Sequence, residues 1–419
     1  MKQLLLILSL AISTNLIAQT NFHQVKYIKA STNDVAIKAF IKNGNYLYVA
    51  SNFSSSYLKT YNIQDPETMY LTDSIKYLST DRNIYDLFID GNNLYAIGEK
   101  GLTIYSLSNP AKPTQTAFIT KVMDGTTERI LKSWSGVKSG NIYLCESGWA
   151  GLMSVNISNT SQPIYNNITT YSGVMTDIKL INSSTALLCD GYDAYKLNFA
   201  NPTNLTKTKI TILGDPSAIC YNSTKNVAYI ASTSSSGSWT RLYVLDINTN
   251  LKTDSIDLYS YDIDVKDMSL KNSDTLLLGT DNGLMILKVS DINNTSVVEY
   301  FDTPYYGGAE DGIISINNNY FIASSYSDIV VYKWGPGGDG INDILGEAIT
   351  IFPNPANNRL TINGLDHNST ISIYDINGKL VYKSEAITNQ IDISNFQNGI
   401  YAIKIESENH VIIKKIIKQ

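Results

Sequence analysis

Seven versions of one pattern run through this chain, and they constrain its fold more than any other feature. Each version has an apolar strand, a short polar turn rich in Gly, Ser and Asp, and a second apolar strand. Two clear examples are "LYAIGEKGLTIYSLSNP" and "LLLGTDNGLMILKVSDI". Because such repetition marks a structural unit that is used again and again, the chain is expected to form a repeat architecture built of strands.

Two sequence markers measure the period of the repeat. A small residue ends the first strand at Ala50, Gly98, Cys145, Cys189, Ala231, Gly279 and Ala323. An apolar residue closes the second strand at Ile63, Leu107, Ile157, Phe199, Ile247, Val289 and Trp334. Both series have a mean spacing of about 45 residues, which is typical of the four-stranded blade of a β-propeller. The prediction is an all-β fold with a seven-bladed β-propeller over residues 19–335.

The last repeat is followed by the Gly-rich stretch "GPGGDG" and lacks an outer strand. The segment "FHQVKYIKA", residues 22–30, alternates polar and apolar residues before the first repeat begins. We expect this segment to join the last blade, because pairing the first strand with the last would remove the exposed edges of the ring.

The wording of "GLTIYSLSNPAKP", residues 101–113, resembles the LVIVD repeat of bacterial and archaeal surface propellers. The resemblance extends in degenerate form over residues 35–335. It implies a secreted or cell-surface propeller and carries over no catalytic residue, since the repeat defines a scaffold.

The first 18 residues, "MKQLLLILSLAISTNLIA", combine Lys2, an apolar core and a small residue at Ala18. This arrangement predicts a secretory signal peptide rather than a membrane anchor. No other apolar run approaches the length of a transmembrane segment. The mature protein is therefore expected to leave the cytoplasm.

Charge and histidine content limit the function classes. Residues 19–348 carry a net charge of −8, because the whole chain has −6 and each flanking segment +1. An acidic body without a basic stripe argues against nucleic acid as a partner. Of the three histidines only His23 belongs to the repeat region, so no histidine-based catalytic triad or multi-histidine zinc site is available there.

Acidic residues recur at the start of the predicted innermost strands. Counting 12 residues back from the small-residue position gives an Asp in four repeats: Asp86, Asp177, Asp267 and Asp311. In a propeller these side chains would converge on one mouth of the central channel. They could accept backbone N–H groups of neighbouring turns, or they could bind Ca²⁺ or a cationic ligand, since hard cations take several oxygen ligands.

Four aromatic residues are predicted to lie in turns: Trp149, Trp239, Tyr192 and Tyr326. Loops on a rigid scaffold often carry binding residues, so these side chains could stack on sugars or grip a peptide. Alternatively, they cover apolar surface between blades.

Residues 336–348 are predicted to form a Gly-rich linker, and a new pattern of short strands begins at residue 349. The stretch "DINGKLV" predicts a hairpin in which Gly378 supplies a positive φ. Short strands and turn signals over residues 349–419 predict a small immunoglobulin-like β-sandwich.

Four stretches of this tail, "FPNPANNRLTI", "IYDINGKLV", "NGIYAIKI" and "VIIKKIIK", resemble the type A C-terminal sorting domain of type IX secretion cargo in Bacteroidota. The resemblance carries onto the following residues: Pro353, Asn354, Pro355, Gly378, Gly399, Tyr401 and Lys418. It implies export through the periplasm by the type IX secretion machinery. It also implies removal of the tail by a sortase-like protease, with cleavage in the linker before Ile349, followed by release or attachment to surface lipopolysaccharide.

The sequence thus favours a non-enzymatic propeller, secreted or displayed on the outer-membrane surface, that binds an unknown glycan or protein and needs no cofactor. The alternative is an extracellular enzyme acting on carbohydrate or peptide with the channel-mouth carboxylates as acid and base.

Overall fold

The computed structural model describes residues 22–28, 36–52, 56–76, 83–146, 151–169, 174–237, 239–261, 263–302, 312–325, 328–335, 350–363, 370–376, 378–384, 389–406 and 411–419. The predicted signal peptide and the predicted linker lie outside these residues. The chain divides into two compact units, one formed by Val25–Trp334 and one that holds the residues from Gly335 onward.

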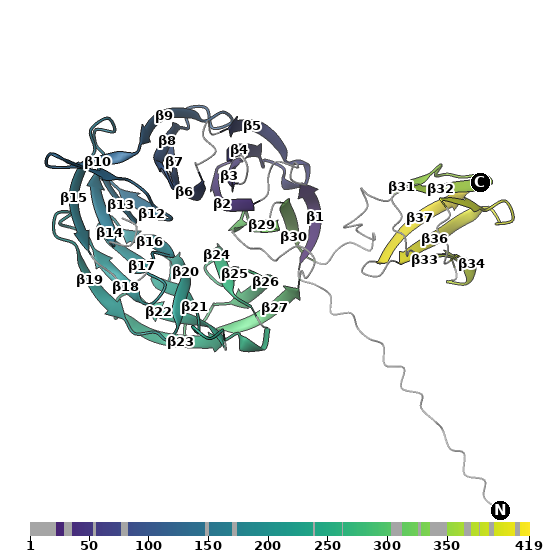
Figure 1. Ribbon diagram of the computed structural model, residues 1–419. Helices are drawn as coiled ribbons and strands as arrows, with labels where there is room; N and C mark the ends of the chain where they lie inside the picture. The colour runs from purple at the N-terminus through teal and green to yellow at the C-terminus, as the bar shows by residue number, and fades with distance from the viewer. Residues whose placement is uncertain are drawn as a thin grey trace, which may run out of the picture. The chain divides into compact units, whose positions relative to one another are not determined.

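Within the described residues, the larger unit has seven mainly antiparallel sheets that follow one another around a common axis (Figure 1). We number the sheets 1 to 7 in chain order, starting with the sheet that contains β2. Sheet 1 has β2 (Ala36–Asn43), β3 (Tyr46–Asn52), β4 (Tyr57–Asn62) and β5 (Tyr70–Lys76). Sheet 2 has β6 (Ile84–Asp90), β7 (Asn93–Gly98), β8 (Gly101–Ser106) and β9 (Thr114–Ile119). Sheet 3 has β12 (Gly136–Ser139), β13 (Ile142–Glu146), β14 (Leu152–Asn156) and β15 (Ile164–Thr169), extended by β10 (Lys121–Asp124) and β11 (Thr127–Ile130).

The remaining four sheets repeat the same order of strands from the axis outwards. Sheet 4 has β16 (Asp177–Asn182), β17 (Thr185–Cys189), β18 (Ala194–Asn198) and β19 (Thr206–Ile210). Sheet 5 has β20 (Asp215–Asn222), β21 (Val227–Thr233), β22 (Thr240–Asp246) and β23 (Leu251–Asp257). Sheet 6 has β24 (Val265–Asn272), β25 (Thr275–Thr280), β26 (Gly283–Lys288) and β27 (Ser296–Asp302). Sheet 7 has β28 (Ile313–Ser315), β29 (Tyr320–Ser325), β30 (Asp328–Trp334) and, next to β30, β1 (Phe22–Ile28).

Sheet 3 departs from the four-strand expectation. Strands β10 and β11 form a hairpin, and β10 pairs in parallel with β15 at Met123 and Ile164. Gly125 forms the turn with φ +61°, a conformation that glycine adopts without strain. The dipeptide Asp124-Gly125 is a hairpin signal that could have revealed this insertion in the sequence.

The middle strands are buried because each sheet packs against both of its neighbours. Every residue of β7 after the first is buried, whereas β5, at the outside of sheet 1, is mostly exposed. The small-residue position has a steric cause in sheet 2, since a Cβ on Gly98 would lie 2.3 Å from the carbonyl oxygen of Asn83. Cys145 and Cys189 fill the same position in sheets 3 and 4 as fully buried free thiols.

The first and last sheets share one apolar core. Ile37 and Leu47 of sheet 1 pack in the same cluster as Ile322 and Val331 of sheet 7. Glu67, after β4, accepts hydrogen bonds from Tyr320 Oη at 2.6 Å and Lys333 Nζ at 2.7 Å. Sheets 1 and 7 are therefore neighbours, although they lie at opposite ends of the repeat region.

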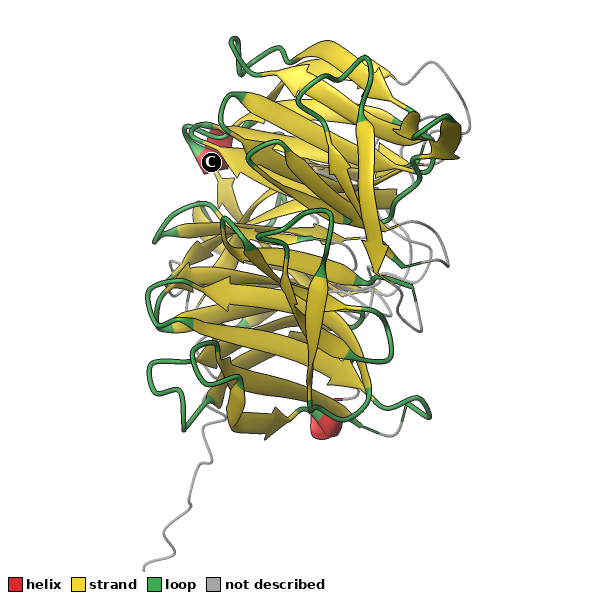
Figure 2. Ribbon diagram, turned by 90° about the vertical axis from the view of Figure 1, so that its left-hand side faces the viewer, coloured by secondary structure: helices red, strands yellow, loops and turns green. Residues whose placement is uncertain are grey.

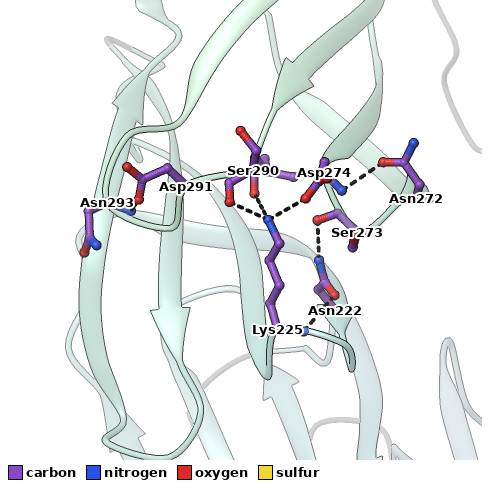
Figure 3. A network of polar contacts seen from close by, with 9 residues as sticks. Asn222, Lys225, Asn272, Ser273, Asp274, Ser290, Asp291 and Asn293 are labelled. Carbon is purple, nitrogen blue, oxygen red and sulfur yellow. Dashed lines mark hydrogen bonds and ion pairs between the residues drawn. The ribbon is translucent and has the colours of Figure 1, made fainter.

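Polar side chains also link neighbouring sheets, as Figure 3 shows for sheets 5 and 6. Lys225, in the turn between β20 and β21, donates to the carbonyl oxygens of Val289 and Ser290, each at 2.7 Å. Its ammonium group also pairs with Asp274 at 2.8 Å. Lys196 makes a similar link by donating to Ile247 of sheet 5 at 2.8 Å. Val289 and Ile247 both belong to the series of apolar residues that close the second strand of each repeat. In both cases a lysine of the preceding sheet donates to the carbonyl oxygen of this residue.

The smaller unit is a pair of antiparallel sheets around its own core. One sheet contains β31 (Thr350–Phe352), β32 (Arg359–Asn363) and β35 (Gln390–Asp392). The other contains β34 (Leu380–Ser384), β33 (Thr370–Asp375), β36 (Gly399–Glu406) and β37 (Val411–Lys418). Leu360, Ile373 and Ile403 are fully buried between them.

The fold is thus all-β, and Figure 2 shows strands in nearly all of its regular structure. The two short 3-10 helices are η1 (Pro66–Thr68) and η2 (Tyr259–Tyr261). Within the described residues, no helix is long and apolar enough to span a membrane.

Candidate binding site

Three of the four predicted carboxylates lie at the starts of innermost strands. Asp86 is on β6, Asp177 on β16 and Asp267 on β24, so they belong to sheets 2, 4 and 6. β-bulges near Asp86 and Asp267 interrupt the pairing with the next strand, and a bulge re-aims the side chains beside it. The fourth, Asp311, lies outside the described residues.

Each of these carboxylates accepts a hydrogen bond from the following sheet. Asp177 accepts from the backbone N–H of Ile219 at 2.8 Å, and Asp267 from that of Ile313 at 2.9 Å. Asp86 accepts from Ser135 Oγ at 2.8 Å. The acids therefore hold neighbouring sheets together, as in the first of the two alternatives drawn from the sequence.

The second oxygen of each carboxylate also has a donor. In Asp86 and Asp267 it accepts from the next residue's backbone N–H, at 2.7 and 2.8 Å. In Asp177 it lies 3.1 Å from Lys179 Nζ. Within the described part of the chain, no group of three or more His, Cys, Asp or Glu side chains is arranged to hold a metal ion.

Lys179 is the electrostatic centre of these acids and was not singled out from the sequence. Burial alone would lower the pKa of Lys179, but the carboxylates of Asp177, Asp86 and Asp267 outweigh it and raise that pKa. Burial raises the pKa of Asp267 to about 6 and also raises that of Asp86, although Lys179 opposes both shifts. The charges of these four groups therefore act on one another.

The structure describes two of the four aromatic residues that were predicted to lie in turns. Trp149 and Tyr326 lie outside the described residues. Tyr192 is 61% exposed in the turn between β17 and β18, where its backbone N–H donates to Asp190. Trp239 is partly buried before β22 and lines a pocket.

This pocket has a volume of about 270 Å³ and is built from the loops of sheets 5 and 6. It is lined by Gly237, Trp239, Thr240, Tyr259, Ile263, Asp264, Asp281 and Asn282. The aromatic residues come from sheet 5 and the segment that follows it, whereas the carboxylates flank β24 and β25 of sheet 6. A concave site with an aromatic wall and a few convergent polar groups is the usual form of a small-ligand site.

Two further residues on this loop face were missed by sequence reasoning. Trp134, before β12, is 41% exposed and its ring lies 4.0 Å from that of Tyr85 between centroids. Glu146, at the end of β13, is 1% exposed, so its carboxyl group is withdrawn from solvent. Burial raises the pKa of Glu146 to about 7. No sequence pattern marks either residue, because an acidic residue or a tryptophan in a turn can be either exposed or buried.

In the smaller unit, several of the sorting-motif residues lie on or beside β37. Asn354 donates from Nδ2 to the Lys415 carbonyl at 2.9 Å and accepts from the Ile417 N–H at 2.9 Å. Its amide side chain thus pairs with the edge of β37, and the flanking residues Pro353 and Pro355 have no N–H to contribute there. At these two positions the backbone has no N–H to donate to β37. The side chain of Asn354 makes the hydrogen bonds to that strand instead.

Gly399 and Tyr401 belong to β36, which pairs with β37, whereas Gly378 lies before β34. Gly399 pairs with Lys418, and Tyr401 with Ile416, in the β36–β37 ladder. Tyr401 Oη donates to the Gln397 carbonyl at 2.7 Å. Gly378 adopts φ +77° in the turn before β34, which fits the positive φ predicted for it.

Comparison with known proteins identifies the tail. Residues 350–419 match the family of secretion system C-terminal sorting domains. The match confirms the predicted type IX sorting domain, which implies export and a secreted or cell-surface location. It covers the tail alone.

A curated relative shares 37% identity with the chain over 73 residues. It is an endo-acting ulvan lyase of Formosa agariphila, and the match covers 16% of this chain and 14% of the lyase. The chain thus spans only a small part of that relative's length.

Solved structures share the fold at low identity. The extracellular domain of BT4673 from B. thetaiotaomicron has a TM-score of 0.55 at 12% identity, covering 95% of this chain and 59% of that one. A chain of the Mitotic Checkpoint Complex has a TM-score of 0.55 at 11% identity, covering 80% and 98%. PorZ, a surface component of the type IX secretion system of Porphyromonas gingivalis, has a TM-score of 0.49 at 12% identity, covering 94% and 60%. At identities this low, the two structures with a TM-score of 0.55 indicate similarity of fold alone.

Proposed function

We propose that this chain is a non-enzymatic, seven-bladed β-propeller of the LVIVD-repeat type that is exported by type IX secretion and binds a ligand through its loop face. Residues 1–18 are its signal peptide, residues 19–335 the propeller, residues 336–348 a linker and residues 349–419 a cleavable sorting tail. β1 completes the last blade, in line with its place beside β30. A sortase-like protease removes the tail, and the propeller is then released or attached to surface lipopolysaccharide.

The pocket between sheets 5 and 6 carries the binding part of this proposal. It lies on loops of a rigid scaffold, where binding residues concentrate. Trp239, Tyr259, Asp264 and Asp281 give it both an aromatic wall and polar groups. Tyr192 and Trp134 add exposed aromatic rings to the same face, because turns between second and third strands and connections between sheets lie at one end of every sheet.

The enzymatic alternative has less support. General acid–base chemistry needs a carboxyl group that can reach the substrate, yet both oxygens of Asp86, Asp177 and Asp267 already have donors within the protein. The lyase similarity covers too little of either chain to extend an activity to this one.

Export is tested by deleting residues 349–419 in the native host and following the protein by cell fractionation. We expect the shortened protein to stay in the periplasm. Undiminished export of the shortened protein would contradict the role of the tail.

Binding is tested by presenting the exported protein to a glycan array and to an array of extracellular proteins. We expect a ligand on one of the two. Absence of any ligand on both arrays would contradict a binding function.

A further inference from the structure

The aromatic wall of the pocket is held in a defined position. A Cβ on Gly214 would lie 2.5 Å from Cη2 of Trp239, so the ring packs directly on the glycine backbone. The guanidinium group of Arg241 lies 5.3 Å from the centroid of the same ring. With a glycine and an arginine fixing it, the indole is preorganised, which reduces the entropy lost on binding.

Two acidic residues that line the same pocket present oxygen atoms in a fixed arrangement. Asp281 Oδ1 accepts the backbone N–H of Asp264 at 2.8 Å, and the Asp281 N–H donates to the Asp264 carbonyl at 3.1 Å. Asp264 Oδ1 in turn accepts from Thr233 Oγ1 at 3.1 Å. These bonds hold two carboxylates side by side, and a carboxylate oxygen can accept more than one hydrogen bond.

Basic groups next to the pocket offset part of its negative charge. Lys266 Nζ lies 3.6 Å from Asp264 Oδ2, with both side chains partly exposed. Arg241 beside Trp239 pairs with Asp257 at 3.1 Å. The cation already beside the indole weakens the attraction of that ring for a second cation, because like charges repel.

From these features we infer that the pocket is a subsite for one neutral saccharide ring, with Trp239 as the stacking wall and Asp264 and Asp281 as hydroxyl acceptors. The inference rests on the proposed binding function and names its ligand class. Sugar rings present C–H groups on their faces, which pack on the negative face of an aromatic ring, and hydroxyl groups at their edges. The volume of about 270 Å³ lies just below the roughly 300–1,000 Å³ of pockets for drug-sized ligands, so it suits a single ring.

The test measures binding of the full exported protein by isothermal titration calorimetry. The probes are the methyl glycosides of glucose, galactose, mannose and xylose and their linear trisaccharides, with tetramethylammonium and lysine methyl ester as cationic probes. We expect at least one saccharide to bind. Trp239→Ala should weaken that binding by about tenfold or more, the usual effect of truncating an aromatic hot spot.

Two variants separate recognition from folding. Trp239→Phe keeps an aromatic face and should retain most of the affinity, and Asp281→Asn should weaken binding because one acceptor oxygen becomes a donor. Tyr70→Ala is the control, since it removes an exposed aromatic side chain from β5, the outer strand of sheet 1, away from the loop face. It should leave the affinity unchanged.

The alternative outcomes each contradict a different statement. Tighter binding of the cationic probes would overturn the ligand class. Saccharide binding that survives Trp239→Ala, or a protein ligand found on the arrays without any saccharide binding, would overturn this site assignment while leaving the proposed function intact. Failure of every probe together with empty arrays would overturn both.

Discussion

Replacing Lys225 with Met tests whether polar links between sheets stabilise the larger unit (Figure 3). The Lys225 side chain is 18% exposed, and its ammonium group donates to two carbonyl oxygens at 2.7 Å. Methionine keeps the apolar stem but removes both hydrogen bonds. A hydrogen bond to a charged group contributes about 1.5–3 kcal/mol. Since water can reach the carbonyls in part, we expect a loss of about 2–3 kcal/mol in the free energy of unfolding.

The assay is differential scanning calorimetry of the full chain, with the transition of the larger unit followed separately. An unfolding entropy of about 2.1 cal/mol/K per residue gives a unit of the size of Val25–Trp334 a loss of about 1.5 °C of Tm per kcal/mol, so the expected fall is about 3–5 °C. Asp274→Asn should change Tm far less, because surface ion pairs contribute little and Asp274 is 58% exposed. Lys112→Met, on an exposed lysine in the turn after β8, is the control.

A Tm of Lys225→Met equal to that of Lys112→Met would refute the reasoning. It would mean that apolar packing between sheets 5 and 6 determines stability without help from the lysine. Saccharide binding should be unchanged in Lys225→Met, because the turn that holds Lys225 lies at the end of sheet 5 opposite to the pocket.

Three other predictions follow from the structure. Burial raises the pKa of Glu146 in the folded protein to about 7, above its value in the unfolded chain. Protonated Glu146 therefore contributes to the free energy of unfolding below about pH 4.5, and this contribution is lost as the pH rises through 7. Glu146→Gln should remove this fall in urea midpoints between pH 5 and 8. Asn354→Ala should lower the stability of the sorting domain by about 0.5–1.5 kcal/mol and speed hydrogen exchange at Ile417. Unchanged exchange would contradict the role of the Asn354 side chain in holding β37. Asp177→Ala removes the charged acceptor of the Ile219 N–H and should cost about 1.5–3 kcal/mol, measured by chemical denaturation, whereas Asp73→Ala on the exposed strand β5 should have little effect.

Local patterns in the sequence predicted the individual strands well. Alternation of polar and apolar residues over 22–30 predicts a strand before the first repeat, and the structure has β1 at Phe22–Ile28. These signals are short-ranged, since side-chain direction and turn geometry depend on neighbouring residues. The repeat pattern does not predict the β10–β11 hairpin, because this hairpin is an insertion that the other repeats lack in the described part of the chain. The Asp124-Gly125 turn signal is its only local mark in the sequence.

The sequence also identified the tail and the spacing of the acids, but it could not assign a role to the acids. Asp177 and Asp267 could have faced a ligand or a neighbouring sheet, and only the distances to the N–H groups of Ile219 and Ile313 distinguish these roles. The residues of each pair are about 40 or more positions apart, so no local pattern records the contact.

By itself, the sequence determined that the chain is a strand-rich repeat protein with a sorting tail. Periodicity and the residues of a short motif can both be recognised from neighbouring positions in the chain. The tertiary structure decided what the singled-out residues do. It placed Lys179 among three carboxylates, turned those acids into links between sheets, and brought Trp239 and Tyr259 together with Asp264 and Asp281 around one pocket. The physical reason is that burial, charge and hydrogen bonding act between atoms close in space, and only the packing of sheets 5 and 6 brings these side chains within reach of one another.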